Sequence, residues 1–241
     1  MRVAAKTDVG QVRLMNEDSY SVGELPSGVV WAIVCDGMGG ASGGDIASQT
    51  AVKMISETIS TAFRQQMGGR TIKNMLFSAI QAANARIFDL AAANEALQGM
   101  GTTVVAAVIT PEAAYIAHVG DSRAYLSTGG QLIQLTKDHS VVQAMVDNGQ
   151  ITEDEAKIHP HKNLITRAVG VGGEVDIDFC EETLRKDDVL LLCTDGLTNM
   201  VELADIQRQL LCGGALCTDD LIAMANQNGG QDNITVVTIA L

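Results

Sequence analysis

The chain has 241 residues, 46% hydrophobic and 19% charged, so it can bury a sizeable core and does not have the composition of a disordered protein. Its 29 acidic and 16 basic residues give a net charge of −13, which argues against DNA, RNA and anionic membranes as partners, because these polyanions bind positive surfaces. No apolar run approaches the roughly 18 residues of a membrane span, and the N-terminus lacks the apolar stretch of a signal peptide. We therefore expect a cytoplasmic protein.

The predicted strands are short runs rich in aliphatic and β-branched residues. They cover residues 29–35, 102–109, 114–119, 123–126, 131–135, 189–193 and 234–241. The chain turns at residues 120–122 and again at residues 129–130, and this spacing predicts two successive hairpins. Such close meanders imply antiparallel pairing.

Two long helices are predicted between the first of these strands and residue 102. Apolar side chains at Ala47, Ala51 and Ile55 share one face of the first helix, and Ile72 and Leu76 begin the corresponding face of the second. The helical segments after the hairpins are shorter. They form an insertion at about residues 138–173 and two further helices at 201–211 and 218–226.

The order of these elements favours an α+β fold, because the strands arrive as hairpins and the helices arrive in blocks. A four-layer αββα sandwich, with two central antiparallel β-sheets flanked by helices, would bury every apolar face. The insertion would then form a small helical flap. We find no linker and no internal repeat, so we expect residues 1–241 to form a single domain.

The five cysteines include no C-x-x-C pair, and Cys35 and Cys193 lie inside predicted strands. We therefore expect buried, reduced thiols in place of disulfides or a zinc site.

Aspartate recurs at the edges of the strongest predicted strands. These residues are Asp18, Asp36, Asp121, Asp195 and Asp232. A single Asp-Gly step such as Asp36-Gly37 is usually only a turn. Ordinary turns would also accept Asn, Ser or Gly, however, so the repetition suggests that the carboxylates converge in one site.

Converging carboxylates repel one another unless a cation shares the site. Oxygen ligands without a His or Cys cluster favour Mg²⁺ or Mn²⁺ over zinc. Two such ions about 3.5–4 Å apart can convert a bridging water into a hydroxide nucleophile and screen the charge of a phosphate. Glycines after Asp36 would allow the Gly37 carbonyl to approach a metal. Arg13 could hold two phosphate oxygens, although a solvated surface arginine is the alternative.

The motifs that carry these residues include CDGMGG, AHVGDSRAYL, LTKDHSVV, LLLCTDGLTNM and GGQDNITVV. In this order they resemble the metal-dependent (PPM-type) serine/threonine protein phosphatases, also called protein phosphatase type 2C. The resemblance covers nearly the whole chain and points to the compact bacterial type that opposes Hanks-type kinases. It implies the αββα sandwich expected above and phosphorylated proteins as substrates, and by default we expect a monomer.

The resemblance also implies a metal-ligand set. Asp36 would bridge two core ions, Mn²⁺ or Mg²⁺, and Gly37 would offer its carbonyl oxygen to one of them. Asp195 and Asp232 would hold the other ion. A third ion, which compact bacterial members often bind, would lie at Asp121 and Asp195.

The same resemblance implies a single-step hydrolysis in which a metal-bridging hydroxide attacks phosphorus. Asp18, together with Glu17, would act through metal-bound water, and Arg13 would clamp the phosphate. No phospho-enzyme is expected. Many bacterial relatives have a histidine, a candidate general acid, at the position of Ala41. A metal-bound water, or His159 or His161 of the flap, could donate the proton instead.

Two other functions compete with this interpretation. The first is an inert relative that binds phosphoproteins, which the missing histidine would favour but the complete set of aspartates opposes. The second is a two-metal hydrolase of nucleotides or phosphodiesters. The negative net charge of the chain argues against nucleic acid as the substrate, but it does not exclude small phosphate esters.

Overall fold

A computed structural model describes residues 1–241, except for the side chains of residues 40–42. It contains two five-stranded sheets in which every neighbouring pair of strands is antiparallel. The first sheet has the order β1 (Arg2–Asp8), β12 (Ile234–Ala240), β11 (Val189–Cys193), β8 (Arg123–Thr128) and β9 (Gln131–Gln134). The second has the order β10 (Asp178–Thr183), β7 (Ala113–Val119), β6 (Val104–Ile109), β3 (Val29–Cys35) and β2 (Ser19–Leu25). A two-stranded ribbon pairs β4 (Gly37–Met38) with β5 (Gly101–Thr102).

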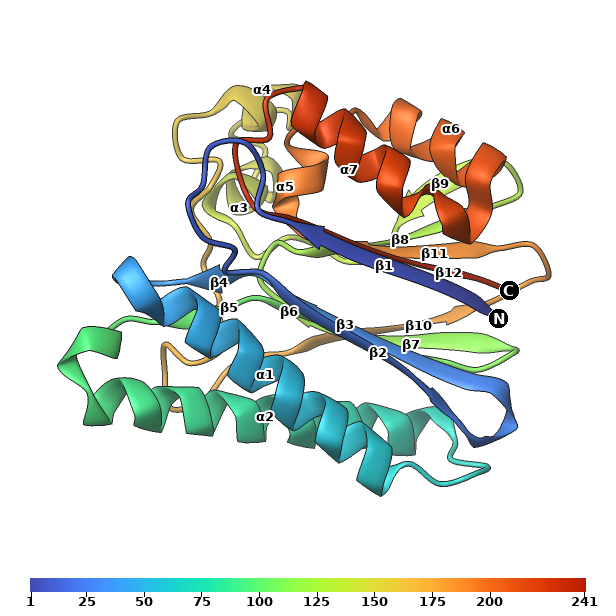
Figure 1. Ribbon diagram of the computed structural model, residues 1–241, viewed down its shortest axis with the longest axis horizontal. Coiled ribbons are helices and arrows are strands. Elements are labelled where there is room, and N and C mark those ends of the chain that lie inside the picture. Colours follow the sequence, from blue (N-terminus) through green and yellow to red (C-terminus); the bar gives the residue numbers. More distant parts are fainter.

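Helices cover the outer faces of both sheets (Figure 1). The long helices α1 (Gly40–Ala62) and α2 (Gly69–Ala93) pack on the second sheet, and α6 (Leu203–Gly213) and α7 (Thr218–Gln227) pack on the first. Short helical turns complete the chain, namely η1 (Pro26–Gly28), η2 (Glu95–Leu97), α5 (Asp195–Thr198) and η3 (Gly214–Cys217). The predicted αββα sandwich is confirmed.

The core consists of three apolar clusters, one for each interface between layers. β3 illustrates why: Val30, Ala32 and Val34 lie in the cluster between the two sheets, whereas the alternate residues Ile33 and Cys35 lie in the cluster under α1 and α2. Side chains on a strand alternate between its two faces, so a strand that is covered on both faces is apolar at every position. The third cluster lies between the first sheet and helices α6 and α7.

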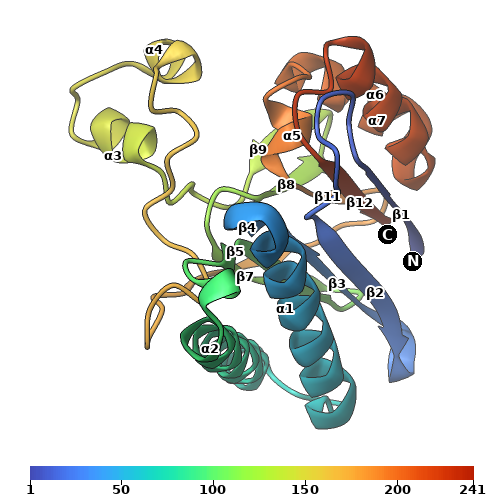
Figure 2. The same ribbon diagram turned by 60° about the vertical axis from the view of Figure 1, so that its left-hand side comes forward.

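The predicted insertion contains α3 (Val141–Asp147) and α4 (Glu153–Ile158), which Figure 2 shows beside the sandwich. Thr152 and Glu155 form a capping box at the start of α4. Among the residues that the structure describes, no helix has the length and apolarity needed to cross a bilayer.

One of the two predicted hairpins is wrong. β8 and β9 do form a hairpin around residues 129–130, but β7 and β8 belong to different sheets. β7 already pairs with β6 on one edge and with β10 on the other, so it has no free edge for β8. The chain therefore crosses from one layer to the other at residues 120–122, where Gly120 has a φ of +103°.

Strands β1 and β10 were not among the predicted strands. Their sequences, RVAAKTD and DFCEET, contain several polar residues, and each strand lies at the edge of its sheet. All five cysteines are free thiols. Cys35, Cys193 and Cys217 are buried as expected, but Cys212 is exposed.

Candidate metal centre

The predicted site residues lie in loops at one end of the sandwich, the end where β4 and α5 are labelled in Figure 1. Asp36 follows β3 directly, Asp195 begins α5 directly after β11, and Asp232 precedes β12. Asp121 lies in the segment that crosses between the sheets. In an antiparallel sheet, the C-terminal end of one strand lies beside the N-terminal end of its neighbour, so residues that follow one strand and precede another meet at the same end of the sheet.

The five carboxylates lie close enough to interact through their charges, and we call the region that they surround the carboxylate pocket. Burial and the negative charges of four neighbours raise the pKa of Asp36 well above its usual range. Those neighbours are Asp18, Asp195, Asp121 and Asp232. The structure therefore brings together all the aspartates that the sequence singled out.

Asp18 is the most enclosed of them, with 7% of its surface exposed. Its Oδ2 accepts hydrogen bonds from the hydroxyls of Thr194 and Thr235, at 2.9 and 2.6 Å, while its Oδ1 is buried and has no partner. Burial raises the pKa of Asp18 to about 7, against the opposing effect of the two hydroxyls. The threonines thus fix the carboxylate through one oxygen and leave the other without a hydrogen-bond partner. Sequence reasoning did not find them, although both lie within three residues of a predicted ligand.

Asp121, which is buried, and Asp195, which is half-buried, also interact through their charges. Burial, followed by the charge of Asp195, raises the pKa of Asp121 to about 8. Burial, followed by the charge of Asp232, raises the pKa of Asp195 to about 6. Asn199 donates a hydrogen bond of 2.9 Å to Asp195 Oδ2, and Asp195 Oδ1 is buried without a partner.

The carboxylate oxygens of this group are suitable ligands for a hard divalent cation. Buried carboxylate oxygens that lack partners, in a group that cannot all ionise without a counter-charge, are the ligands that Mg²⁺ and Mn²⁺ take. The position after Asp36 requires glycine, because a Cβ at Gly37 would lie 2.1 Å from the Gly44 carbonyl oxygen and 2.6 Å from that of Glu17. Only glycine can follow Asp36 in this backbone path.

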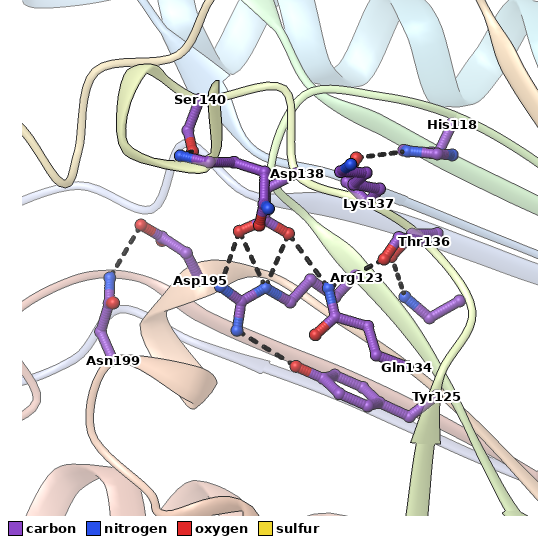
Figure 3. A network of polar contacts seen from close by, with 12 residues as sticks. His118, Arg123, Tyr125, Gln134, Thr136, Lys137, Asp138, Ser140, Asp195 and Asn199 are labelled. Carbon is purple, nitrogen blue, oxygen red and sulfur yellow. Dashed lines mark hydrogen bonds and ion pairs between the residues drawn. The ribbon is translucent and has the colours of Figure 1, made fainter. Parts of the chain in front are cut away.

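An ion pair behind the carboxylates was not predicted (Figure 3). Arg123 Nε lies 2.9 Å from Asp138 Oδ1, and its NH2 donates to Asp138 Oδ2 at 2.6 Å, so the pair is bidentate. Arg123 also donates to the Tyr125 hydroxyl, and its charge opposes the burial that raises the pKa of Asp195. The motifs GDSR and KDHS contained both partners, but nothing in the sequence pairs residues 15 positions apart in this way.

Arg13 lies at the open side of the pocket. Its NH2 donates to Asp232 Oδ2 at 2.8 Å, and 52% of its side chain is exposed. The guanidinium therefore reaches the carboxylate group while its remaining donors face solvent, where a phosphate could meet them.

Asn233 holds the loop that carries Arg13, and sequence reasoning missed it. Its Nδ2 donates to the carbonyls of Val9 and Met15, at 2.9 and 3.0 Å, and its Oδ1 accepts from the Glu17 N–H at 2.8 Å. With 6% of its surface exposed, this one amide fixes both ends of the loop. Its place directly after Asp232 was the available signal.

Among the described residues, one group of three side chains has its ligand atoms within 4.8 Å of one another, namely His118, His139 and Asp178, and no three of the five aspartates approach one another this closely. His139 Nδ1 already accepts the Gly120 N–H, and the Arg167 guanidinium lies 3.1 Å from its Nε2. The positive charge of Arg167 would repel a metal ion at this position. We therefore interpret the group as a structural support for residues 120–122. His118 is only partly satisfied, because its Nε2 contacts the Lys137 carbonyl but its buried Nδ1 has no partner in the described structure.

The histidines of the flap do not reach the carboxylates through any hydrogen bond of the described residues. His159 and His161 instead contact each other, with ring centroids 5.4 Å apart. Ala41, the position of the missing histidine, lies outside the residues whose side chains are described.

Comparison with known proteins agrees with this geometry. A family model described as Protein phosphatase 2C matches residues 10–230. The serine/threonine phosphatase stp of Listeria welshimeri is 40% identical, with 99% of this chain and 95% of the relative covered. Protein phosphatase PhpP of Streptococcus pneumoniae is 37% identical, with 100% of this chain and 98% of the relative covered.

Solved structures are similar over the same length. The serine/threonine phosphatase of S. agalactiae superposes with a TM-score of 0.92 at 37% identity, covering 100% of this chain and 99% of that one. The catalytic domain of the phosphatase PstP, solved in complex with two manganese ions, has a TM-score of 0.87 at 35% identity and covers 98% of this chain and 96% of that one. The chain therefore belongs to the protein phosphatase 2C family, whose members are metal-dependent serine/threonine protein phosphatases.

Proposed function

We propose that this phosphatase removes phosphate from serine and threonine side chains at the carboxylate pocket, with Arg13 as the phosphate-binding residue. The observation that supports this most directly is the convergence of five aspartates around buried oxygens without partners. A pocket of this charge cannot hold a phosphate alone, so cations must stand between the two.

The ligands that fit two divalent ions, Mn²⁺ or Mg²⁺, are Asp36, the carbonyl of Gly37, Asp195 and Asp232. A third ion would use Asp121 and Asp195. When bound, these ions would activate a water molecule and screen the charge of the phosphate.

Two groups of the chain itself complete the site. Asp18, held by two threonine hydroxyls, keeps its free oxygen in position to orient water, and half-buried Glu17 lies beside it in sequence and near Arg13. Arg13 would exchange its bond to Asp232 for two bonds to phosphate oxygens, which neutralises charge on the equatorial oxygens during the displacement.

We further propose that residues 1–241 act as one catalytic domain, a cytoplasmic monomer with its flap at 138–173, and that it reverses a bacterial Hanks-type kinase. The three apolar clusters that join all four layers support a single domain. The bacterial serine/threonine phosphatases among its relatives support the link to a kinase.

The test is phosphate release from a phosphothreonine peptide with Mn²⁺, with a chelator, and with the Asp36→Asn variant. We expect hydrolysis that requires Mn²⁺ and is lost in the variant. Asp219→Asn, which changes an aspartate with 73% of its side chain exposed, is the matched control and should retain activity. Hydrolysis that persists after complete metal removal would contradict the proposal.

The absence of a histidine at Ala41 leads to a separate prediction. If a general acid is missing, nitrophenyl phosphate, which needs little protonation of its leaving group, should be hydrolysed more readily than phosphopeptides. Ala41→His should then change the ratio of the two rates, and an unchanged ratio would show that the histidine is not needed.

A further inference from the structure

The loop that carries Arg13 also displays apolar side chains. We define the Arg13 loop as residues 9–17, between β1 and β2; it lies beside α5 in Figures 1 and 2. Leu14 is 99% exposed, Val12 63% and Met15 52%. Single exposed apolar residues are ordinary on protein surfaces, but three within four positions, directly flanking a phosphate-binding residue, form a patch that can contact a ligand.

The exposure of these side chains follows from a fixed backbone. Beyond the three hydrogen bonds of Asn233, the Gln11 N–H donates to the Gly230 carbonyl at 2.7 Å, and Asn16 Nδ2 donates to the Thr7 hydroxyl at 2.8 Å. The loop is therefore anchored at its start, its middle and its end. Leu14 lies between these anchors, with 99% of its surface exposed.

The apolar side chains flank the residue that would meet the phosphate. Val12 and Leu14 are the chain neighbours of Arg13, and consecutive Cα atoms are about 3.8 Å apart. A peptide whose phosphorylated residue meets Arg13 has its own flanking residues at the same spacing. The side chains next to the phosphorylated residue are therefore within reach of the Arg13 loop.

The charge of the surroundings selects among those flanking side chains. Glu17 and Asp232 both act on Arg13, and the chain as a whole has a net charge of −13. Acidic flanking residues would be repelled there, and small polar ones would leave the apolar surface in water. A large apolar flanking residue would remove its own surface and that of Leu14 from water together.

We propose that Val12, Leu14 and Met15 form a substrate-selecting surface that favours phosphoproteins with a large apolar side chain one or two residues from the phosphorylated serine or threonine. This rests on the proposed function, because it takes Arg13 as the phosphate-binding residue. The occupant of the patch is the substrate segment itself.

The experiment compares phosphothreonine peptides that differ only in one flanking residue, leucine or serine, and measures kcat/KM for each with Mn²⁺. The wild-type protein should favour the leucine peptide by about tenfold, the effect expected for partial burial of one leucine side chain. Leu14→Ser should reduce that ratio to about twofold. A third peptide with a flanking glutamate should be hydrolysed more slowly than the serine peptide.

The ratio is taken within one preparation, so a loss of folded enzyme lowers both rates and leaves the ratio unchanged. Leu216→Ser is the matched control, because Leu216 is 69% exposed on η3, outside the Arg13 loop, and its ratio should equal that of the wild-type protein. A wild-type ratio near one, or an unchanged ratio in Leu14→Ser, would overturn the proposal. Failure to hydrolyse any of the peptides would instead overturn the proposed function.

Discussion

The two sides of the carboxylate pocket differ in how they hold charge. On the inner side, Asp18 and Asp121 are 7% and 9% exposed, and fixed side chains surround them. On the outer side, Arg13 and Asp232 have 52% and 35% of their side chains exposed. Charge that is kept out of water is costly unless it is paired, whereas charge at the surface costs little. We therefore expect the inner side to control metal binding and stability, and the outer side to control the contact with substrate.

The largest expected effect is the loss of activity in the Asp36→Asn variant, which replaces a carboxylate that lies between the inner and outer sides. Asp36→Asn should lower kcat/KM for phosphopeptides by at least about a thousandfold, because one carboxylate that two ions would share is lost. The same change should leave the metal-free protein at least as stable, since it replaces a carboxyl group whose ionisation burial and four neighbouring carboxylates oppose. Thermal unfolding with a chelator checks the second outcome, and a large destabilisation would contradict the account of the inner side.

A smaller effect, on stability, is expected from the ion pair behind the inner side. Arg123→Met leaves Asp138 largely buried without its partner, so the free energy of unfolding should fall by about 3–5 kcal/mol. Replacing both residues, as in Arg123→Met with Asp138→Leu, should recover part of this loss. Arg13→Met on the outer side should change stability by less than about 1 kcal/mol. Equal losses in denaturant unfolding for Arg123→Met and Arg13→Met would remove the distinction between the two sides.

The pH dependence of stability should also separate them. In the metal-free protein burial raises the pKa of Asp18 to about 7 and that of Asp121 to about 8, against about 3.9 for an exposed aspartate. The folded state then binds more protons than the unfolded state between pH 4 and 8, so the unfolding free energy falls as the pH rises through this window. The slope reaches about 1.4 kcal/mol per pH unit for each such group.

Mn²⁺ should counter that loss by compensating the ionised carboxylates. We expect the difference in melting temperature between protein with Mn²⁺ and protein with chelator to be larger at pH 8 than at pH 5.5. A difference that shrinks as the pH rises would mean that the inner carboxylates are not the metal ligands.

The smallest effect that we predict concerns the outer side. Asn233→Ala removes three hydrogen bonds of the Arg13 loop, so phosphate binding should weaken and kcat/KM should fall by about tenfold, mainly through KM. The loss should be much smaller in an Arg13→Ala background, because the two residues would act through one contact. Additive losses, or an altered affinity for Mn²⁺, would indicate that Asn233 acts on Asp232 and the metals and not on Arg13.

Much of the fold could be predicted from the sequence. The uninterrupted apolar run of β3 and the helical repeat from Ile72 to Ile87 depend on local spacing, and the structure buries these positions as predicted. Asp18, Asp36, Asp121, Asp195 and Asp232 were found because each stands at the edge of such an element. The family motifs then identified the chemistry that could bring them together.

The tertiary structure decided what local spacing does not contain. Gly120 allows a hairpin as readily as a crossing between sheets, and the crossing occurs because β6 and β10 occupy both edges of β7. Arg123 donates to Asp138, and Asn233 accepts from the Glu17 N–H. The sequence spacing of these pairs matches neither helical nor strand periodicity, so the pairs could not be predicted from the sequence. The sequence by itself determined which residues are apolar and which carry charge. Only the packing of the layers decided which charges share a pocket, because burial and pairing are properties of neighbours in space.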